Sequence, residues 1–266
     1  MNQSSRRPKL GQHFLHQEGF CRRIAGSLPI EPDDLLVEIG SGHGDMTRLL
    51  ADRCSNLTAV EIDPALAAAL RAEFQGDDRV EIIEQDILQV GLDDLCRRRR
   101  AEQCCVFGNL PYYITSPILH RLFAARARIR HMTLLVQLEV ARRLTAQPGH
   151  RDYGYLSVLV QCSSRPRILF EVPPGAFSPP PKVDSALVDF PMASRFPEWD
   201  EGTLAGFLRF VQRCFAQKRK SLLNNLLPSC PRTRIQQTIE SLDFSPSIRA
   251  EQLDLEQLAS VFFALK

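Results

Sequence analysis

The sequence predicts an α/β protein in which a doubly wound, mostly parallel sheet is followed by a small, all-helical C-terminal domain. Short apolar runs alternate with helical patterns over the first two-thirds of the chain, and one run ends in a glycine-rich turn. Only helical patterns follow Pro191. The chain has 266 residues, 44% of them hydrophobic, which suits one large and one small domain. We expect these domains to comprise residues 1–195 and 196–266.

Four strands are expected in the first half of the chain. The first is followed by the glycine-rich turn and then by apolar residues at helical spacing. After the second, Asp63 and Pro64 provide an N-cap and a proline for the first turn of a helix. The third strand closes on Asp86 and the fourth leads directly into Asn109. Their expected ranges are 35–39, 57–62, 80–83 and 104–107.

Three later runs, 132–138, 167–172 and 186–190, also fit strands, and a proline-rich segment over 173–181 separates the last two. Residues 197–200 fit a linker to the helical domain. Beyond them, apolar residues from Leu204 to Phe215 follow the helical period, and Asp254 with Gln257 fits a capping box. No internal repeat is evident.

Composition excludes several classes of protein. No apolar run approaches the roughly eighteen residues of a membrane span, and residues 1–9 are short, polar and basic. A patterned segment already begins at Leu10, which leaves no room for a removable leader, so we expect a cytoplasmic protein without membrane contact. The eight cysteines are scattered without a C-x-x-C pair, which indicates reduced, mostly buried residues and no metal site.

Charge alone does not indicate a nucleic-acid partner, because 33 basic residues nearly balance 31 acidic ones. The basic residues are clustered, however, at 97–100, 126–130, 142–143 and 218–220. Each such cluster is by itself more often a solvated face than a binding site. We interpret the 97–100 run as a solvated helix end or loop.

A candidate cofactor site lies at the ends of the first three strands. Gly40, Gly42 and Gly44 form a G-x-G-x-G turn, and Glu61 follows about twenty residues later. The distance from turn to carboxylate matches the dinucleotide pattern, but the glycines run G-x-G-x-G instead of G-x-G-x-x-G, which favours a nucleoside without a pyrophosphate. With Asp86, the turn and two carboxylates could meet a methionine tail, a ribose and an adenine amino group. The arrangement resembles the Rossmann-like sheet of class I methyltransferases binding S-adenosyl-L-methionine. A tight turn with Glu61 as a helix cap is the structural alternative.

The fourth strand leads into Asn109-Leu110-Pro111-Tyr112, whose residue types suit methylation of adenine N6. The lone pair of N6 is delocalised, so acceptors such as the Asn109 side-chain oxygen and the Leu110 carbonyl would stabilise the developing positive charge. Tyr112 can stack on the base, and Pro111 stiffens the turn. No general base is obligatory, because the proton can leave after transfer. Alone, the motif could be an ordinary turn; its position after three cofactor-lining strand ends favours catalysis.

The chain resembles the KsgA/RsmA family of small-subunit rRNA adenine dimethyltransferases from about Leu10 to its C-terminus. The resemblance rests on an N-terminal cofactor motif, a glycine loop, a ribose-binding strand end, an N-L-P-Y catalytic motif, an F-x-P-x-P-x-V-x-S loop and a C-terminal helix segment. These correspond to residues 11–15, 37–44, 60–63, 109–112, 177–185 and 217–226.

The resemblance implies roles for individual residues. Phe177 and Tyr112 would hold the target adenine between their rings, with Asn109, Leu110 and Pro111 completing the catalytic set. The implied cofactor contacts are His13, Leu15, Gly40, Glu61, Asp86 and Asn109. The family usually has asparagine in place of His13. Since imidazole can also donate a hydrogen bond, we expect this contact to persist with altered strength or pH dependence.

The implied product is N6,N6-dimethyladenosine at two adjacent adenosines in a hairpin loop near the 3′ end of small-subunit (16S) rRNA. The implied partner is a partly assembled 30S subunit, with a monomeric enzyme, a role in ribosome biogenesis and no DNA substrate. Unpaired loop bases can enter a pocket at modest unstacking cost, and basic clusters would hold phosphates. The alternatives are a large-subunit rRNA methyltransferase of the antibiotic-resistance type, a non-enzymatic RNA-binding or assembly factor, and a small-molecule methyltransferase.

Overall fold

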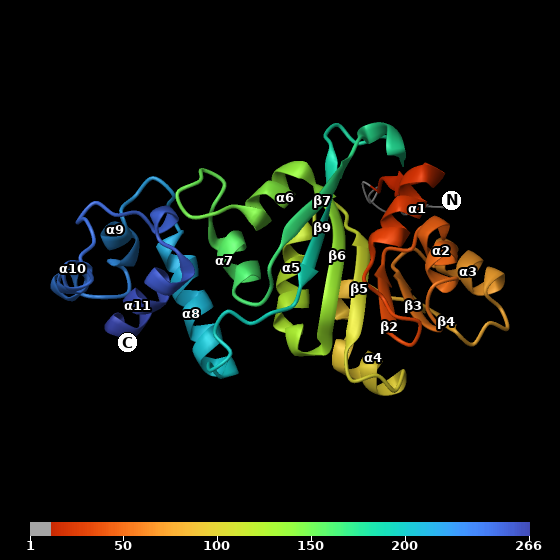
Figure 1. The fold of residues 1–266 in the computed structure, drawn as a ribbon, viewed down its shortest axis with the longest axis horizontal. Helices are drawn as coiled ribbons and strands as arrows, with labels where there is room; N and C mark the ends of the chain where they lie inside the picture. Colours follow the sequence, from red (N-terminus) through yellow and green to blue (C-terminus); the bar gives the residue numbers. More distant parts are fainter. Residues whose placement is uncertain (1–11) are drawn as a thin grey trace, which may run out of the picture. The chain divides into compact units, whose positions relative to one another are not determined.

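The computed structural model describes residues 12–266, which form two compact units (Figure 1). The first unit runs to Ala141 and also includes Arg167–Met192; the second comprises Arg142–Pro166 and Ala193–Lys266. The expected boundary after residue 195 lies close to Met192, where the chain leaves the first unit for the last time. Residues 142–166, however, belong to the second unit. Leu10, where the patterned segment begins, and Gly11, the first residue of the N-terminal motif, lie outside the described residues.

The first unit is built on a seven-stranded sheet with the order β4-β3-β2-β5-β6-β9-β7. The pairs from β4 to β6 are parallel, whereas β9 is antiparallel to both β6 and β7. A doubly wound, mostly parallel sheet is therefore confirmed. The strands are β2 (Leu35–Ile39), β3 (Asn56–Glu61), β4 (Val80–Glu84), β5 (Cys104–Asn109), β6 (Ile129–Gln137), β7 (Arg167–Val172) and β9 (Ser185–Pro191).

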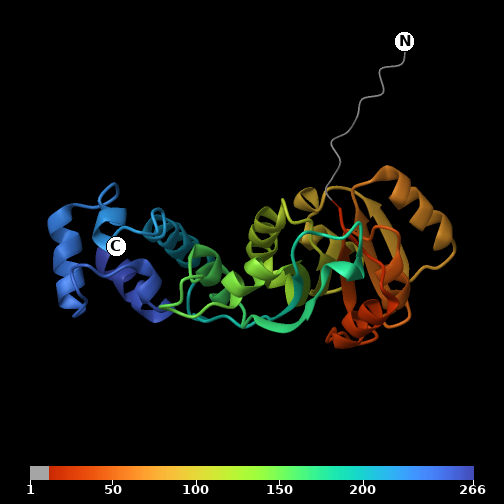
Figure 2. The same ribbon diagram turned by 90° about the horizontal axis from the view of Figure 1, so that it is seen from above.

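Helices lie on both faces of this sheet (Figures 1 and 2). Every residue of β2 is buried, as expected for a strand covered on both sides. Cys21 and Ile24 of α1 and Leu50 of α2 belong to a core with Leu36 and Phe107 of the sheet. The helices are α1 (Glu18–Ser27), α2 (Asp45–Ala51), α3 (Pro64–Glu73), α4 (Leu92–Arg98), α5 (Thr115–Ala124) and α6 (Leu138–Thr145), the last crossing into the second unit.

The expected start of α3 is confirmed. The Asp63 side chain accepts hydrogen bonds from the main-chain nitrogens of Ala65 and Leu66, and Pro64 occupies the first turn. Short 3₁₀ turns connect other elements at Ile87–Gln89 (η1), Arg126–Arg128 (η2), Pro174–Ala176 (η3) and Ala250–Gln252 (η4).

A separate two-stranded sheet brings distant segments together in the first unit. Strand β1 (Phe14–Leu15) pairs antiparallel with β8 (Phe177–Ser178), which places Leu15 opposite Phe177. The N-terminal motif therefore lies against the proline-rich loop that precedes β9. Sequence patterns did not predict this pairing, because each strand has only two residues.

The second unit is helical and has its own core. Tyr153 and Val158 belong to the same apolar cluster as Phe207, Leu223 and Leu258, which explains why residues 142–166 join this unit. Its helices are α7 (Tyr155–Gln161), α8 (Glu201–Cys214), α9 (Leu222–Leu226), α10 (Arg232–Ser241) and α11 (Leu255–Leu265).

Two local predictions for the second unit can be compared with its structure. The capping box at the start of α11 is confirmed, since Gln257 N donates to Asp254 and Asp254 N donates to Gln257. The expected linker packs against the core of the second unit. Trp199 stacks on Phe196 with ring centroids 3.9 Å apart, and Asp200 caps α8.

The predicted burial of most cysteines is confirmed. Seven of the eight are buried, Cys230 is partly exposed, and no disulfide joins them. Across residues 12–266 we find no cluster of three or more side chains suited to holding a metal ion. Within the same range, every helix is too short or too polar to cross a membrane.

Candidate active site

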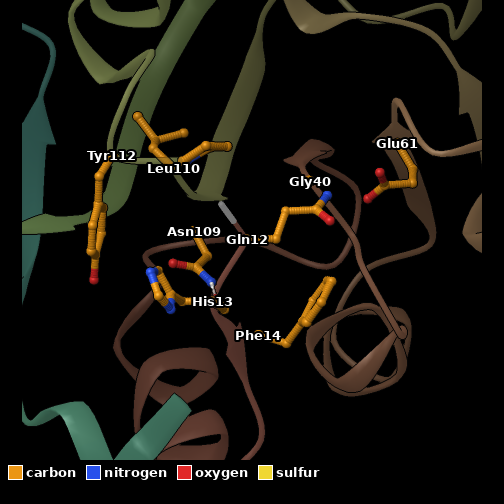
Figure 3. A pocket seen from close by; sticks show the side chains of 9 residues that line it. Gln12, His13, Phe14, Gly40, Glu61, Asn109, Leu110 and Tyr112 are labelled. Carbon is orange, nitrogen blue, oxygen red and sulfur yellow. Dashed lines mark hydrogen bonds between the residues drawn. The ribbon is translucent and has the colours of Figure 1, made fainter. Parts of the chain in front are cut away.

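The candidate site lies where the direction of strand order changes, between β2 and β5. Gly40 follows β2 and Asn109 ends β5, and a Cβ on Gly40 would lie 3.8 Å from the Asn109 carbonyl oxygen. In open α/β sheets, ligands bind at this position. A first pocket here is lined by Gln12, His13, Phe14, Gly40, Glu61, Asn109, Leu110, Pro111 and Tyr112 (Figure 3). Most of the predicted site residues are thus brought together.

The glycine turn holds the Glu61 carboxylate through the main chain. Gly42 N donates to Glu61 Oε2 at 2.8 Å, and Asp63 N donates to Oε1 at 2.9 Å. Gly42 has a φ of 57°, and a Cβ there would lie 2.7 Å from the Phe14 ring. Gly42 is therefore required both by the backbone conformation and by the close approach of β1.

The Asn109 side chain has a defined orientation. Its Nδ2 donates a hydrogen bond to the His13 carbonyl oxygen at 2.9 Å. Only the amide nitrogen can make this contact, because a carbonyl accepts and cannot donate. The side-chain oxygen of Asn109 therefore points to the other side, beside His13 and toward Tyr112 (Figure 3). This leaves an acceptor available in the pocket.

Tyr112 and His13 both contact the segment that leads into β9. The Tyr112 hydroxyl is 2.6 Å from Ser185 Oγ, and burial raises the pKa of this phenol. His13 Nδ1 lies 2.7 Å from the Pro179 carbonyl oxygen. The rings of His13 and Tyr112 have centroids 5.5 Å apart at an interplanar angle of 32°. The turn at residues 109–112, the N-terminal motif and the proline-rich loop are thus connected around one pocket.

A second pocket adjoins the glycine turn and includes Leu15 and Asn109. Glu38, on β2, lies in its lining and is 1% exposed. Burial is the main cause of a raised pKa of this carboxyl; a hydrogen bond from Thr47 Oγ1 lowers the pKa and the charge of Glu61 raises it, for a net pKa of about 7. The buried Ser41 Oγ, in the same lining, has no hydrogen-bond partner within residues 12–266.

Sequence reasoning missed two residues at this site. Glu38 is a charged residue inside an otherwise apolar strand, and that contrast was the available signal. Ser41 lies between two glycines of the turn.

Two predicted site residues are absent from the lining of both pockets. Asp86 caps η1 by accepting a hydrogen bond from Leu88 N at 2.9 Å. Phe177 is 2% exposed and packs in the core with Leu15, because the pairing of β1 with β8 directs both side chains inward. The structure therefore does not place Phe177 opposite Tyr112.

Several basic residues of the predicted clusters make contacts within the protein. Arg98 pairs with Glu81, Arg99 donates to Asn56, and Arg128 pairs with Asp93. The 97–100 run does lie at the end of α4, as expected. Arg142, Arg143, Arg219 and Lys220 are exposed and remain candidates for phosphate contacts.

A family model for ribosomal RNA adenine dimethylase matches residues 3–266. The chain belongs to this family. Membership in the ribosomal RNA adenine dimethylases makes it a methyltransferase with adenine of ribosomal RNA as its substrate class, and the methyltransferase fold predicted from the sequence is confirmed.

Similar sequences span almost the whole chain. "Ribosomal RNA small subunit methyltransferase A" of Acidobacterium capsulatum is 44% identical over 98% of this chain and 91% of that protein. The protein of the same name from Koribacter versatilis is 39% identical over 98% of this chain and 95% of its own length. These alignments cover most residues of both units of this chain.

Two solved structures resemble this dimethylase closely. The 23S rRNA methyltransferase ErmE has a TM-score of 0.72 and 29% identity, covering 95% of this chain and 99% of its own. A dimethyladenosine transferase from Plasmodium falciparum has a TM-score of 0.79 and 22% identity, covering 94% and 96%. The latter likeness establishes the fold alone.

Proposed function

We propose that this enzyme transfers methyl groups from S-adenosyl-L-methionine to N6 of two adjacent adenosines in a hairpin loop near the 3′ end of 16S rRNA. The product is N6,N6-dimethyladenosine, formed during assembly of the small ribosomal subunit. The orientation of Asn109 carries the proposal, because its hydrogen bond to His13 leaves the side-chain oxygen facing the pocket. The small-subunit target rests on the 44% identity with a small-subunit methyltransferase.

The two pockets suit S-adenosyl-L-methionine. This cofactor supplies an electrophilic methyl group on a sulfonium. Gly40 has no side chain, so the cofactor can approach the main chain closely there. Glu61 provides carboxylate oxygens for the ribose hydroxyls. The unpartnered Ser41 hydroxyl can satisfy a polar group of the amino-acid portion, next to Leu15. We retain Asp86 as the contact for the adenine amino group, since one of its oxygens is not needed for the cap.

The chain's own residues provide the chemistry on the target base. The Asn109 side-chain oxygen and the Leu110 carbonyl accept hydrogen bonds from N6, which stabilises the positive charge that develops on this nitrogen. Pro111 restricts the turn so that both acceptors face the base. Tyr112 provides a stacking surface, and its hydrogen bond to Ser185 fixes the ring.

Phe177 is proposed as the second ring against the adenine. Since it is 2% exposed, it must leave the core next to Leu15 when the base enters. Exposing a phenylalanine side chain costs about 1.5–3 kcal/mol, which contacts with the base would have to offset. The proposed sandwich therefore involves a rearrangement of the loop that carries β8.

The proposed partner is small-subunit rRNA within a partly assembled 30S subunit, bound by a monomeric, cytoplasmic enzyme. Exposed Arg142, Arg143, Arg219 and Lys220 are the proposed phosphate contacts. Binding through phosphates weakens as salt concentration rises. An affinity that does not change with salt would contradict this part of the proposal.

The decisive experiment offers labelled S-adenosyl-L-methionine with three substrates: unmethylated small subunits, large subunits and naked rRNA. We expect label on two adjacent adenosines of small-subunit rRNA. The likeness to ErmE, a 23S rRNA methyltransferase at 29% identity, makes large-subunit methylation the second candidate. Label found only in large-subunit RNA would overturn the small-subunit assignment, and no label anywhere would favour a non-enzymatic assembly factor.

A further inference from the structure

The imidazole of His13 is a protonatable side chain in the lining that it shares with Asn109, Leu110 and Tyr112. Its Nδ1 lies 2.7 Å from the Pro179 carbonyl oxygen. A carbonyl can only accept a hydrogen bond, so Nδ1 must carry a proton. In the neutral ring, the lone pair then lies on Nε2. The contact with Pro179 thus selects the tautomer whose free nitrogen can accept a proton.

The position of the ring brings this nitrogen to the reacting end of the pocket. The two ring nitrogens of an imidazole point in widely different directions, so Nε2 does not face Pro179. The His13 ring lies beside the Asn109 side-chain oxygen and is turned toward Tyr112 (Figure 3), with its centroid 5.5 Å from that of the Tyr112 ring. Because the Asn109 oxygen is the proposed acceptor for N6, His13 borders the same space.

We propose that His13 Nε2 accepts the proton that adenine N6 loses in each methyl transfer. This role rests on the proposed function. For each methyl group, the bond from N6 to the methyl carbon forms as the carbon–sulfur bond breaks, and its electron pair stays on sulfur. One proton passes from N6 to His13, which becomes an imidazolium. His13 then releases this proton to water and can serve the second transfer.

Other groups in the lining are less suited to hold the proton. The amide oxygen of Asn109 and the Leu110 carbonyl accept hydrogen bonds but are not basic near neutral pH. Tyr112 keeps its own proton and is bonded to Ser185. Both oxygens of Glu61 are engaged by the main chain at Gly42 and Asp63. His13 is partly exposed, which lets it exchange its proton with solvent between transfers.

The tautomer can be measured without any methyl transfer. In ¹⁵N NMR spectra of the free protein with labelled histidine, we expect neutral His13 to be protonated on Nδ1 and unprotonated on Nε2. The signal is assigned by its loss in His13→Asn. A neutral ring protonated on Nε2 would overturn the proposal, because that nitrogen could not then accept a proton.

The catalytic role is tested by single-turnover methyl transfer at fixed pH. His13→Asn keeps a donor for the Pro179 carbonyl but has no basic nitrogen, so it separates positioning from proton transfer. General bases typically contribute 10²–10⁴-fold. Water can replace His13 in part, so we expect about a tenfold slower rate in this variant. In His13→Ala, added free imidazole should restore most of the lost rate.

His150→Ala is the matched control, because this histidine is exposed in the second unit. Its rate should equal that of the wild type, with or without imidazole. A wild-type rate in His13→Asn, or no response to imidazole in a folded His13→Ala, would overturn the role of His13. If His13→Ala does not fold, the methyl-transfer rate of His13→Asn and the tautomer found by NMR decide whether His13 accepts the proton. A wild-type protein that transfers no methyl group would instead refute the proposed function.

Discussion

The buried carboxyl of Glu38 makes the stability of the first unit depend on pH. Glu38 is the fourth of the five residues of β2, is 1% exposed and accepts a hydrogen bond from Thr47 Oγ1 at 2.7 Å. Burial is the largest effect and raises its pKa from 4.5 to about 7. The folded protein therefore binds this proton more tightly than the unfolded chain does.

The sign and size of the effect follow from this difference. Stability from protonated Glu38 is fully present below pH 4.5 and is lost as the pH rises through about 7. At about 1.4 kcal/mol for each pH unit, the full loss is about 3 kcal/mol. Glu38→Gln removes the titration and retains an acceptor for Thr47. The variant should thus gain stability relative to the wild type as the pH increases.

Urea unfolding at a series of pH values measures this difference in stability directly. Between pH 5 and pH 8, we expect the free energy of unfolding of Glu38→Gln minus that of the wild type to increase by about 2–3 kcal/mol. Thr47→Val should extend the loss to higher pH, because its hydrogen bond holds the pKa of Glu38 down. A difference between Glu38→Gln and wild type that stays constant over this range would refute the reasoning.

Three further variants test the site. Asn109→Ala should fold and bind cofactor yet transfer methyl groups about 10²–10³-fold more slowly in single-turnover assays, and near-normal turnover would remove its proposed role. Ser185→Ala should lose about 1 kcal/mol of stability in urea unfolding and slow methyl transfer by freeing Tyr112, with little added effect in a Tyr112→Phe background. Gly42→Ala should lose about 1–3 kcal/mol in thermal unfolding, because its φ is 57°; unchanged stability would contradict the contact with β1.

Local sequence patterns predicted well where the strands β2, β3 and β5 end. The run before Gly40 became β2, the one before Asp63 became β3, and the one before Asn109 became β5. A buried parallel strand needs a continuous apolar run, and a tight turn after it needs glycine or a cap. Both requirements are met by residues within a few positions of each other. The placement of Gly40, Glu61 and Asn109 around one pocket followed from these strand ends.

Features that depend on tertiary contacts were not predictable in the same way. Residues 142–166 join the helical unit because Tyr153 and Val158 pack into its core, and neither their spacing nor a linker composition marks this. The burial of Phe177 follows from a pairing of two-residue strands that no periodicity reveals. The raised pKa of Glu38 depends on burial, on Glu61 and on Thr47 together.

The orientation of Asn109 depends on a series of contacts between distant segments. Its amide nitrogen is bonded to the carbonyl of His13, 96 residues away, and the His13 ring is bonded to the carbonyl of Pro179, 166 residues from it. Either carbonyl could be supplied by many residue types, so the sequence around Asn109 does not encode the orientation. An N-L-P-Y turn without these partners could rotate its amide freely. The motif is therefore a weak signal by itself, and the contact with His13 turns its oxygen toward the proposed position of N6.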